Sequence, residues 1–553
     1  MAFLAKIRET QLAFAPFLFK PFFLETALFL QFKMLNFRAF WDISSGSRSL
    51  LLFAICALSV RDLICVIPVS FRVFSQFPGL MFRSFQMLSR SLALSRRHIS
   101  GISPSQAVRT LSNPIEGRSA NYTSLETAIS EVKSGDSIHV HSCAATPTEL
   151  LDELCKQSVS RDLKNIMLSH IITMGKTDWL TKPEFSDRIR SNCFFLDGNT
   201  RKPVKGGTAD FIPVFLYDTV RLYDEKIIPV DCAFITVSPP DAHGYCSMGV
   251  SGDCSTAGAR NAKKIIAIEN PSMPRTFGDT VIHVSQIDAI VKVTDRNIYE
   301  LSNGKGSEEE KIIGKLIAEN LVDNGATLQL GIGAIPDSTL AGMHHHKDLG
   351  IHSEMISDGV IELIKKGVVT NNKKTVLPGQ VVTSFAMGSR QFYDFIDGNP
   401  QFTFASAGYT NSVHVISDQH KMTAINSCIE VDLTGQICSD SIGPNVYSGY
   451  GGQVDFIAGT ALAKDRQGKP IIALTSQTNK GQSKIVPFLK EGSGVVTTRG
   501  HVRYVVTEYG IAQLWGKNLR QRAYELINIA HPNHRAELEK AALERLKCMP
   551  SKD

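Results

Sequence analysis

The stretch Val322-Asp-Asn-Gly-Ala-Thr-Leu-Gln-Leu330, with Gly331-Ile-Gly-Ala-Ile-Pro336 directly after it, decides how the fold is interpreted. Its apolar and β-branched residues predict a short strand over residues 327–330. The glycines that follow predict a tight loop, and Pro336 suits the first turn of a helix that continues through Leu340. A strand, a glycine loop and a helix N-terminus in this order expose backbone N–H groups to an anion or an oxyanion.

The same pattern occurs in an earlier part of the chain, as Val132-Lys-Ser-Gly-Asp-Ser-Ile-His-Val140, a loop of small residues and Pro147. Three repeats in the same order along the chain indicate an internal duplication. We therefore interpret the body of the protein as two related halves. The two further pairs of similar segments are residues 235–238 with 472–475, and residues 287–295 with 502–508.

Short β-branched runs alternate with amphipathic segments from about Tyr122 onward, which is typical of βαβ units and a mainly parallel sheet. The fold class is therefore α/β, with halves over residues 117–300 and 305–545. In such pairs the active site commonly lies in the cleft between the halves, outside the carboxyl ends of the strands. The expected strands are residues 137–141, 166–171, 193–196, 234–237, 265–268, 289–293, 327–330, 380–383, 471–474 and 502–506.

The first hundred residues differ in composition from the rest of this chain of 553 residues. They contain sixteen of its thirty Phe residues, and twelve Lys and Arg against four acids, a net charge of +8. Because the whole chain has a formal net charge of +6, the remaining residues carry −2. This balance leaves no basic body of the kind that binds nucleic acid. The length predicts two or three globular domains.

Residues 87–100 are rich in Arg and Ser, contain no acid and alternate Leu with basic residues, as mitochondrial presequences do. We therefore expect the protein in the mitochondrial matrix. Residues 1–86 are then a non-globular extension or an artefact of the gene model, and residues 87–116 a presequence-like segment and linker. Arg61-Asp62 interrupts the longest apolar run, so that no uncharged window crosses a bilayer comfortably and no membrane anchor is expected.

The eleven cysteines are scattered, without a Cys-x-x-Cys pair or the spacing of a zinc finger. This usage fits a reducing compartment and argues against a structural metal. His344-His-His346 is not expected to bind a metal, because neighbouring residues on a helix point about 100° apart. We predict neither a metal nor a permanently bound cofactor.

Two further segments of the second half are candidates for a functional site. Residues 448–456 contain three glycines ahead of a predicted helix through Ala463, and such a loop lets backbone approach a ligand closely. Glu354 follows a short extended piece that begins at Gly350. Taken alone, a solvated surface glutamate explains Glu354 better than a catalytic one.

Together, these segments resemble the acetyl-CoA hydrolase/CoA-transferase family, and most closely its 4-hydroxybutyrate CoA-transferase-like members. The resemblance extends from about Tyr122 to His534 and implies the duplicated α/β fold of the glutamate-dependent CoA-transferases. The long N-terminal extension is the departure from the family's pattern. The segments that carry the resemblance are residues 239–249, 331–336, 352–359, 378–380, 451–456 and 509–516.

The resemblance also implies roles for individual residues, and the family's catalytic glutamate falls on Glu354. Coenzyme A is then both a substrate and part of a covalent intermediate. Acyl-CoA and small carboxylates are the expected partners, and we expect a homodimer. The positions that match the family's oxyanion and CoA contacts are Gly331, Ile332, Gly333, Ala334, Ile335, Gly451 and Gly452.

The chemistry of a thioester agrees with these parts. A glutamate carboxylate in a cleft with little solvent can attack the acyl carbon, and backbone N–H groups of Ile332 and of the Gly451-Gly452 loop can hold the oxyanion. The CoA thiolate then converts the acyl-glutamyl anhydride into a glutamyl-CoA thioester. An incoming carboxylate, which is acetate, succinate, butyrate or 4-hydroxybutyrate, reverses the sequence and leaves as acyl-CoA.

Three other functions remain open at this point. With water as the acceptor, the same Glu354 would make the protein an acyl-CoA hydrolase. A sugar-phosphate isomerase of related architecture would need a phosphate clamp and a base that moves protons. A non-catalytic CoA-binding protein would bind its ligand without turnover.

Overall fold

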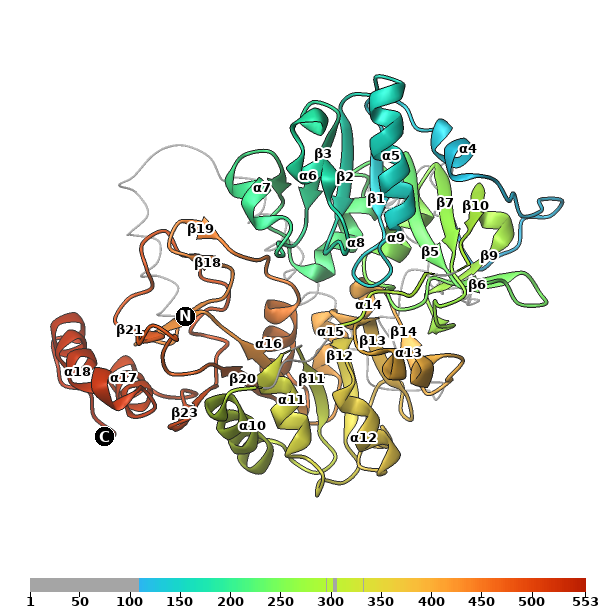
Figure 1. Ribbon diagram of the computed structural model, residues 1–553. Coiled ribbons are helices and arrows are strands. Elements are labelled where there is room, and N and C mark those ends of the chain that lie inside the picture. The colour runs from blue at the N-terminus through green and yellow to red at the C-terminus, as the bar shows by residue number, and fades with distance from the viewer. Residues whose placement is uncertain (1–108, 295, 302–305, 332) are drawn as a thin grey trace, which may run out of the picture. The chain divides into compact units, whose positions relative to one another are not determined.

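The computed structural model describes residues 109–553 apart from residues 295, 302–305 and 332 (Figure 1). These residues all lie within one unit of the chain, Ser103–Asp553. The predictions for residues 1–86, and those for the presequence-like segment as far as residue 108, lie outside the described residues.

The first half forms a seven-stranded parallel sheet with the order β10-β7-β5-β1-β2-β3-β4, in the cyan and green part of Figure 1. Most of its strands are buried on both faces, as expected for a parallel sheet between helices. Its strands are β1 (Ser137–Val140), β2 (Ile166–His170), β3 (Ile189–Cys193), β4 (Asp210–Phe211), β5 (Cys232–Val237), β7 (Lys264–Glu269) and β10 (Ala289–Lys292).

The second half forms a nine-stranded sheet with the order β23-β22-β20-β15-β11-β12-β13-β14-β8. It is parallel apart from the edge strand β23, and the other edge strand, β8, comes from the first half. Its strands are β8 (Phe277–Gly278), β11 (Thr327–Leu330), β12 (Gly350–Ile356), β13 (Val381–Ala386), β14 (Phe402–Phe404), β15 (Met422–Ser427), β20 (Lys469–Ala473), β22 (Tyr504–Thr507) and β23 (Gly510–Gln513).

The two sheets have the same topology, which confirms the predicted pair of related α/β halves. In each half the first strand is central, the second to fourth strands lie on one side of it, and the fifth, sixth and seventh lie on the other. The first predicted repeat falls on the equivalent strands β1 and β11, and the third on β10 and β22. The second repeat was wrong, because it paired β5 with β20 whereas the equivalent of β5 is β15. Buried parallel strands share an apolar composition, so similarity between two of them does not fix their positions.

Helices cover the sheets and continue the alternation of strand and helix (Figure 1). In the first half these are α4 (Leu125–Ser130), α5 (Thr148–Ser160), α6 (Asp178–Thr181), α7 (Arg201–Lys205), α8 (Leu216–Asp224) and α9 (Ser255–Asn261). In the second half they are α10 (Glu308–Leu321), α11 (Ala334–Ala341), α12 (Gly359–Lys365), α13 (Arg390–Ile396), α14 (Ala407–Thr410), α15 (Val413–Ser417), α16 (Gln453–Ala461), α17 (Leu519–Asn528) and α18 (Pro532–Leu546).

Short strands complete the fold and form three small sheets. They are β6 (Tyr245–Ser247) with β9 (Val281–His283), β16 (Glu430–Asp432) with β17 (Ile437–Cys438) and β21 (Ile485–Val486), and β18 (Ser441–Ile442) with β19 (Asn445–Val446).

The first repeat begins with the same turn in both halves. Gly135 and Gly325 precede β1 and β11 and have φ angles of +85° and +77°. A residue with a side chain rarely adopts this left-handed conformation, which explains a glycine at the same place in each copy. In the second copy, Pro336 lies in the first turn of α11, as the sequence predicts.

One predicted strand differs from the structure, and several strands of the two main sheets were not predicted, among them β4, β14 and β23. We predicted a strand over residues 193–196, whereas β3 ends at Cys193. β3 alternates buried residues with the half-buried Arg190 and Asn192. Because of these two polar residues, the sequence showed no apolar run that would have indicated the strand. We expected only a short extended piece at β12 and predicted no strand at β15.

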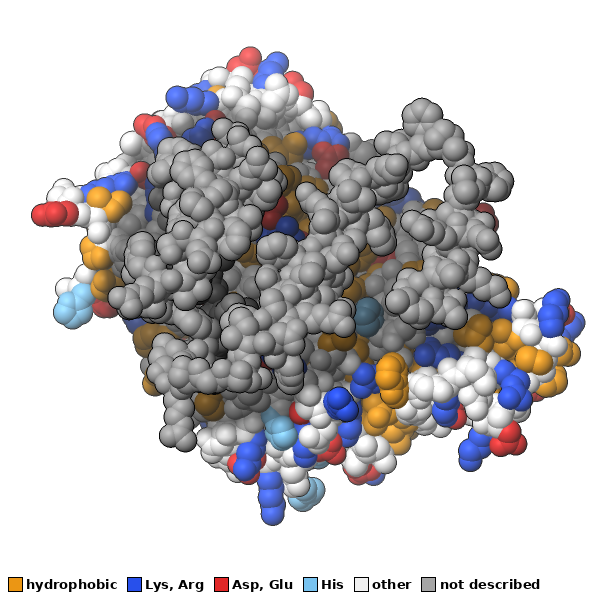
Figure 2. Space-filling model, turned by 180° about the vertical axis from the view of Figure 1, so that it is seen from behind, with side chains coloured by type: hydrophobic (Ala, Val, Ile, Leu, Met, Phe, Trp, Pro, Cys, Tyr) orange, Lys and Arg blue, Asp and Glu red, His pale blue; other side chains and the backbone are white. Residues whose placement is uncertain are grey.

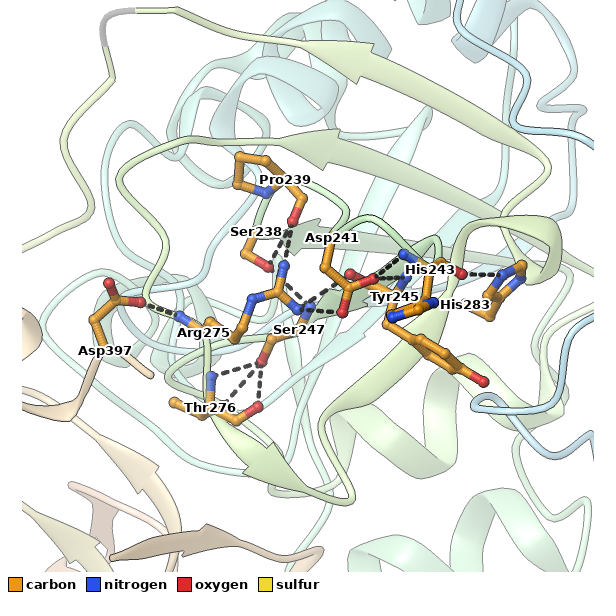
Figure 3. Close-up of polar contacts among 10 residues, drawn as sticks. All are labelled: Ser238, Pro239, Asp241, His243, Tyr245, Ser247, Arg275, Thr276, His283 and Asp397. Atoms are coloured by element: carbon orange, nitrogen blue, oxygen red, sulfur yellow. Dashed lines mark hydrogen bonds and ion pairs between the residues drawn. The ribbon is translucent and has the colours of Figure 1, made fainter. Parts of the chain in front are cut away.

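The motif of residues 239–249 joins the two halves through Arg275 (Figure 3). The Arg275 guanidinium donates to the carbonyl oxygens of Pro239 at 2.7 Å and Tyr245 at 3.1 Å, and lies 3.5 Å from the Asp241 carboxylate. The backbone N–H of Arg275 donates to the carboxylate of Asp397, in the second half, at 2.7 Å. This motif therefore has a structural role, since it holds a loop of the first half against the second half.

The described part of the surface seen in Figure 2 carries intermixed basic and acidic side chains. Among the residues described between 109 and 553, no helix combines the length and the apolar character needed to span a membrane. Within the same residues, no group of three or more His, Cys, Asp or Glu side chains is arranged to hold a metal ion.

Candidate active site

Glu354 lies near the carboxyl end of β12, between β11 and β13. Two residues earlier on the same face of this strand, His352 is fully buried and its Nε2 lies 2.8 Å from the carbonyl oxygen of Thr410. Burial lowers the pKa of His352 to about 3, so its ring is neutral at physiological pH. The strand thus presents Glu354 beside an uncharged neighbour.

The Glu354 side chain lines a pocket of about 210 Å³ to which both halves contribute. Apart from Glu354 and the amides Gln329, Asn426 and Gln453, its side chains are almost all apolar. The first half supplies Ile171, Ile172, Phe195 and Leu216. The second half supplies Gln329, Leu330, Gly331, Glu354, Met355, Phe385, Met387, Asn426, Tyr450, Gly451, Gly452 and Gln453.

The position of this pocket agrees with the predicted cleft at the carboxyl ends of the strands. Ile171 and Ile172 directly follow β2, and Phe195 follows β3. Gly331 follows β11 and Met387 follows β13. An apolar cluster that includes several of the pocket residues contains side chains of both halves and packs the two halves together.

Asn411 connects Glu354 to the buried carboxylate of Asp455. The Nδ2 atom of Asn411 donates to Glu354 Oε2 at 3.0 Å and to Asp455 Oδ2 at 3.2 Å. Asp455 lies in the first turn of α16 and also accepts the backbone N–H of Tyr217, from α8 of the first half, at 3.2 Å. The pair of acids is therefore bound to both halves.

Burial raises the pKa of Glu354 to about 7, the hydrogen bond from Asn411 opposes this shift, and the charge of Asp455 adds to it. The backbone N–H of Gly452 favours the ionised form as well. Burial likewise raises the pKa of Asp455 to about 7, against hydrogen bonds from Asn411 and Tyr217. A carboxylate with such a pKa is more basic than a solvated one and is still largely ionised at slightly alkaline pH.

The loop of residues 449–452 approaches Glu354 so closely that a side chain at residue 452 has no room. A Cβ atom on Gly452 would lie 1.8 Å from Glu354 Oε2 and 2.2 Å from Asn411 Nδ2. Gly451 has a φ angle of +54°, and its carbonyl oxygen accepts the backbone N–H of Leu216 at 3.0 Å. These two glycines are required for different reasons, Gly452 for space and Gly451 for its backbone conformation.

The structure brings Glu354, Gly331, Gly451 and Gly452 of the predicted site into one pocket. Ile332 lies outside the described residues. The other three predicted residues do not line this pocket: Gly333 precedes α11 with a φ angle of +119°, Ala334 borders a separate hollow beside α10, and Ile335 is buried in the core of the second half. Contact of these residues with CoA stays a prediction.

Sequence reasoning missed Asn411 and gave no role to Asp455. Asp455 stands in the segment 451–456 that carries the family resemblance, so its position near the glycines was visible. Asn411 follows the short helix α14 with no motif around it, and only the fold brings it to Glu354.

Comparisons with known proteins identify the family of this chain. Residues 118–298 match the sequence model of the acetyl-CoA hydrolase/transferase N-terminal domain, and residues 388–542 match that of the C-terminal domain. The succinyl-CoA:acetate/propanoyl-CoA:succinate CoA transferase of Fasciola hepatica is 49 % identical over 79 % of this chain and 91 % of that protein. The chain belongs to the acetyl-CoA hydrolase/transferase family. Glu354 lies between the two matched regions.

Other members of this family extend the comparison. The 4-hydroxybutyrate coenzyme A transferase of Clostridium kluyveri is 47 % identical over 75 % of this chain and 95 % of that protein. The crystal structure of RipA from Yersinia pestis superposes with a TM-score of 0.73 at 33 % identity, and covers 77 % of this chain and 98 % of that one. An acetyl-CoA hydrolase of Kluyveromyces lactis is more distant, at 27 % identity over 45 % of this chain and 48 % of that protein.

Proposed function

We propose that this protein is a CoA-transferase that moves CoA between an acyl-CoA and a small carboxylate, with Glu354 as the nucleophile. The observation that carries the proposal is one basic carboxylate, with its pKa raised by burial, in a mostly apolar pocket between the two halves. The relatives are named as CoA transferases of succinate, acetate and 4-hydroxybutyrate. These names support the same reaction class and these acyl groups.

The reaction needs only groups that the pocket and its substrates supply. An Oε atom of Glu354 attacks the thioester carbon, the C–S bond breaks, and CoA leaves as the thiolate. The thiolate then attacks the glutamyl carbonyl carbon, the acyl group leaves as a carboxylate, and Glu354 carries CoA as a thioester. A second carboxylate reverses both steps. We therefore propose that CoA is a substrate and that the reaction needs no metal or resident cofactor.

Backbone donors are proposed to hold the oxyanion of each step. Asn411 and the Gly452 N–H already contact the Glu354 carboxylate, and the pocket contains no Lys or Arg side chain among its described lining residues. Gly452 and Ile332 are the proposed donors, as two peptide N–H groups suffice to stabilise an oxyanion in a site with little water.

An apolar pocket also favours transfer over hydrolysis. Four first-half side chains, Ile171, Ile172, Phe195 and Leu216, line the pocket with Glu354, and an apolar lining limits the access of water to the activated acyl group. Hydrolysis of acyl-CoA remains the second candidate, because the same glutamate would serve it and distant relatives are hydrolases. We further propose a mitochondrial location and a homodimer, which rest on the sequence and the family respectively.

The test of this function is a covalent adduct on Glu354. Incubation with acyl-CoA in the absence of an acceptor should place CoA on Glu354 as a thioester, which mass spectrometry of the digested protein locates. Borohydride should reduce this adduct to an alcohol and inactivate the enzyme, whereas acyl-CoA alone or borohydride alone should not. Glu354→Ala should form no adduct and lose transfer by several orders of magnitude.

The acceptor separates the two candidate activities. If added carboxylate accelerates the loss of acyl-CoA and appears as new acyl-CoA, the protein is a transferase. If acyl-CoA disappears at the same rate without carboxylate, the protein is a hydrolase. An adduct on another residue, or a fully active Glu354→Ala protein, would refute the proposed nucleophile.

A further inference from the structure

Asp455 is a buried acid that lies beside the nucleophile and has no role in the proposed reaction. It is 5 % exposed, and Asn411 Nδ2 donates both to its Oδ2 and to Glu354 Oε2. Because the two oxygens share one nitrogen partner at 3.2 and 3.0 Å, they lie within 6.2 Å of each other. At this separation in a site with little water, two negative charges repel each other strongly.

The groups around the pair supply no compensating positive charge among the described residues. His352 on β12 is neutral because burial lowers its pKa, and burial raises the pKa of Cys143, in the loop after β1, well above its ordinary value. The remaining titratable groups that act on the pair are acids. They are Asp253, which precedes α9 and raises the pKa of Glu354, and Asp218 on α8, which raises that of Asp455.

The orientation of Asn411 agrees with two ionised acids. Its Nδ2 has two hydrogens, one for each carboxylate, and its Oδ1 atom is buried without a hydrogen-bond partner. A flipped amide would point Oδ1 at two carboxylate oxygens, which also have lone pairs only. Asp455 therefore holds the amide of Asn411 in the orientation that Glu354 needs.

We propose that Asp455 is a positioning residue whose negative charge, exerted across Asn411, destabilises the free carboxylate of Glu354 and so favours its covalent, neutral forms. In the first step the charge of Glu354 leaves with the electron pair of the broken C–S bond and resides on the thiolate. In the second step it leaves with the released carboxylate. Each covalent state of Glu354 thus relieves the repulsion from Asp455. This inference rests on the proposed function, since it requires a glutamyl intermediate.

A purely structural role for Asp455 is the competing explanation, because the backbone N–H of Tyr217 also donates to it. Loss of that contact would lower the stability of the fold and the total activity, but it would not change the ionisation of Glu354. The pH dependence of the reaction and the amount of covalent adduct therefore distinguish the two roles.

The experiment compares wild type with Asp455→Asn in the full chain. The acid limb of kcat/KM should move to lower pH by about one unit or more, because Glu354 loses a neighbouring charge that raises its pKa. At pH 8.5, the equilibrium ratio of CoA adduct to free enzyme should fall about tenfold for each unit of this shift. Asp455→Glu, which keeps the charge, should restore the acid limb toward its wild-type position.

Asp218→Asn is the matched control, because Asp218 is another acid near the pair but forms a surface ion pair with Arg221 at 3.0 Å. Because Asp218 acts on Asp455 and not directly on Glu354, its replacement should move both readouts much less than Asp455→Asn does. If Asp455→Asn does not fold, Asp455→Ser replaces it, since the serine hydroxyl can still accept the Tyr217 N–H. An unmoved acid limb and a wild-type adduct level in the folded variant would refute the role of Asp455. A wild-type protein without any adduct would instead refute the proposed function.

Discussion

Replacing Gly452 with alanine should remove activity while leaving the fold nearly intact. The added Cβ atom would lie 1.8 Å from Glu354 Oε2, and real contacts of this kind are essentially never shorter than 3.0 Å. The carboxylate must therefore move by more than an ångström, and Asn411 must move as well, since its Nδ2 lies 2.2 Å from the same position. A misplacement of about 1 Å at a reacting atom typically costs about 10²-fold in rate.

The fold should tolerate this change because the backbone of Gly452 is not strained. Its φ and ψ angles are −99° and 11°, which alanine adopts, and the atoms in the way belong to side chains. We expect kcat to fall by about 10²-fold or more, with a melting temperature close to that of wild type. The assay is transfer of CoA from acyl-CoA to acetate, together with thermal unfolding of the same sample.

Gly451→Ala provides the contrast. Its Cβ atom would lie 3.6 Å from Phe195 and 3.7 Å from Glu354, which are ordinary contacts, but its φ angle of +54° disfavours a side chain. This variant should therefore lose about 1 kcal/mol of stability and retain more activity than Gly452→Ala. If Gly452→Ala is active, or if it melts early while Gly451→Ala does not, the steric argument is wrong and the loop serves packing.

Two further outcomes follow from the charge and the composition of the chain. The raised pKa of Glu354 means that its ionised form is penalised in the fold but not in the unfolded chain, so the protein should lose stability as the pH rises from about 4.5 to about 7. Glu354→Gln should remove this loss. At pH 8 the variant should be more stable than wild type by no more than about 3 kcal/mol. Urea unfolding of both proteins at pH 5 and at pH 8 measures the difference. A chain that begins near Ser100 should be soluble and as active as the full chain, because residues 1–86 differ in composition from the repeats. Loss of solubility in gel filtration of the shortened chain, without a comparable loss on mutating Arg96 and Arg97, would make the extension a structural element.

The sequence predicted the repeated architecture because its signal is local. The turn glycines Gly135 and Gly325 and the strands that follow them are separated by few residues, and their backbone requirements limit the sequence strongly. The glycine loops beside Glu354 were visible for the same reason. By contrast, β12 contains Gly, His, Ser and Glu at positions where a parallel strand is usually apolar, because its carboxyl end serves the site. Function here overrides strand composition.

The contacts that matter most to Glu354 are long-range and could not be predicted from spacing. Asn411 lies 57 residues from Glu354 along the chain, and Tyr217 lies 238 residues from Asp455. No periodicity or motif joins such positions. Only the packing of α8 against α14, and of α15 against α16, brings them together.

The duplicated fold accounts for the properties of Glu354, the proposed nucleophile of this pocket. In the second half, the carboxyl end of β11 leads to Gly331, whose bare backbone lines the pocket, and β12 places Glu354 beside it. At the equivalent place in the first half, β1 leads to the fully buried Cys143, and the first half contributes only apolar side chains to the pocket. The two halves therefore have different roles. The second half supplies the polar groups, and the first half excludes the water that would otherwise solvate them. Burial is the largest cause of the raised pKa of Glu354. The basicity of this carboxylate therefore depends on the apolar side chains that the first half provides. An enlarged pocket, such as Phe195→Ala would create, should thus lower the basicity of Glu354 and admit water as an acceptor, although Phe195 carries no chemical group of its own.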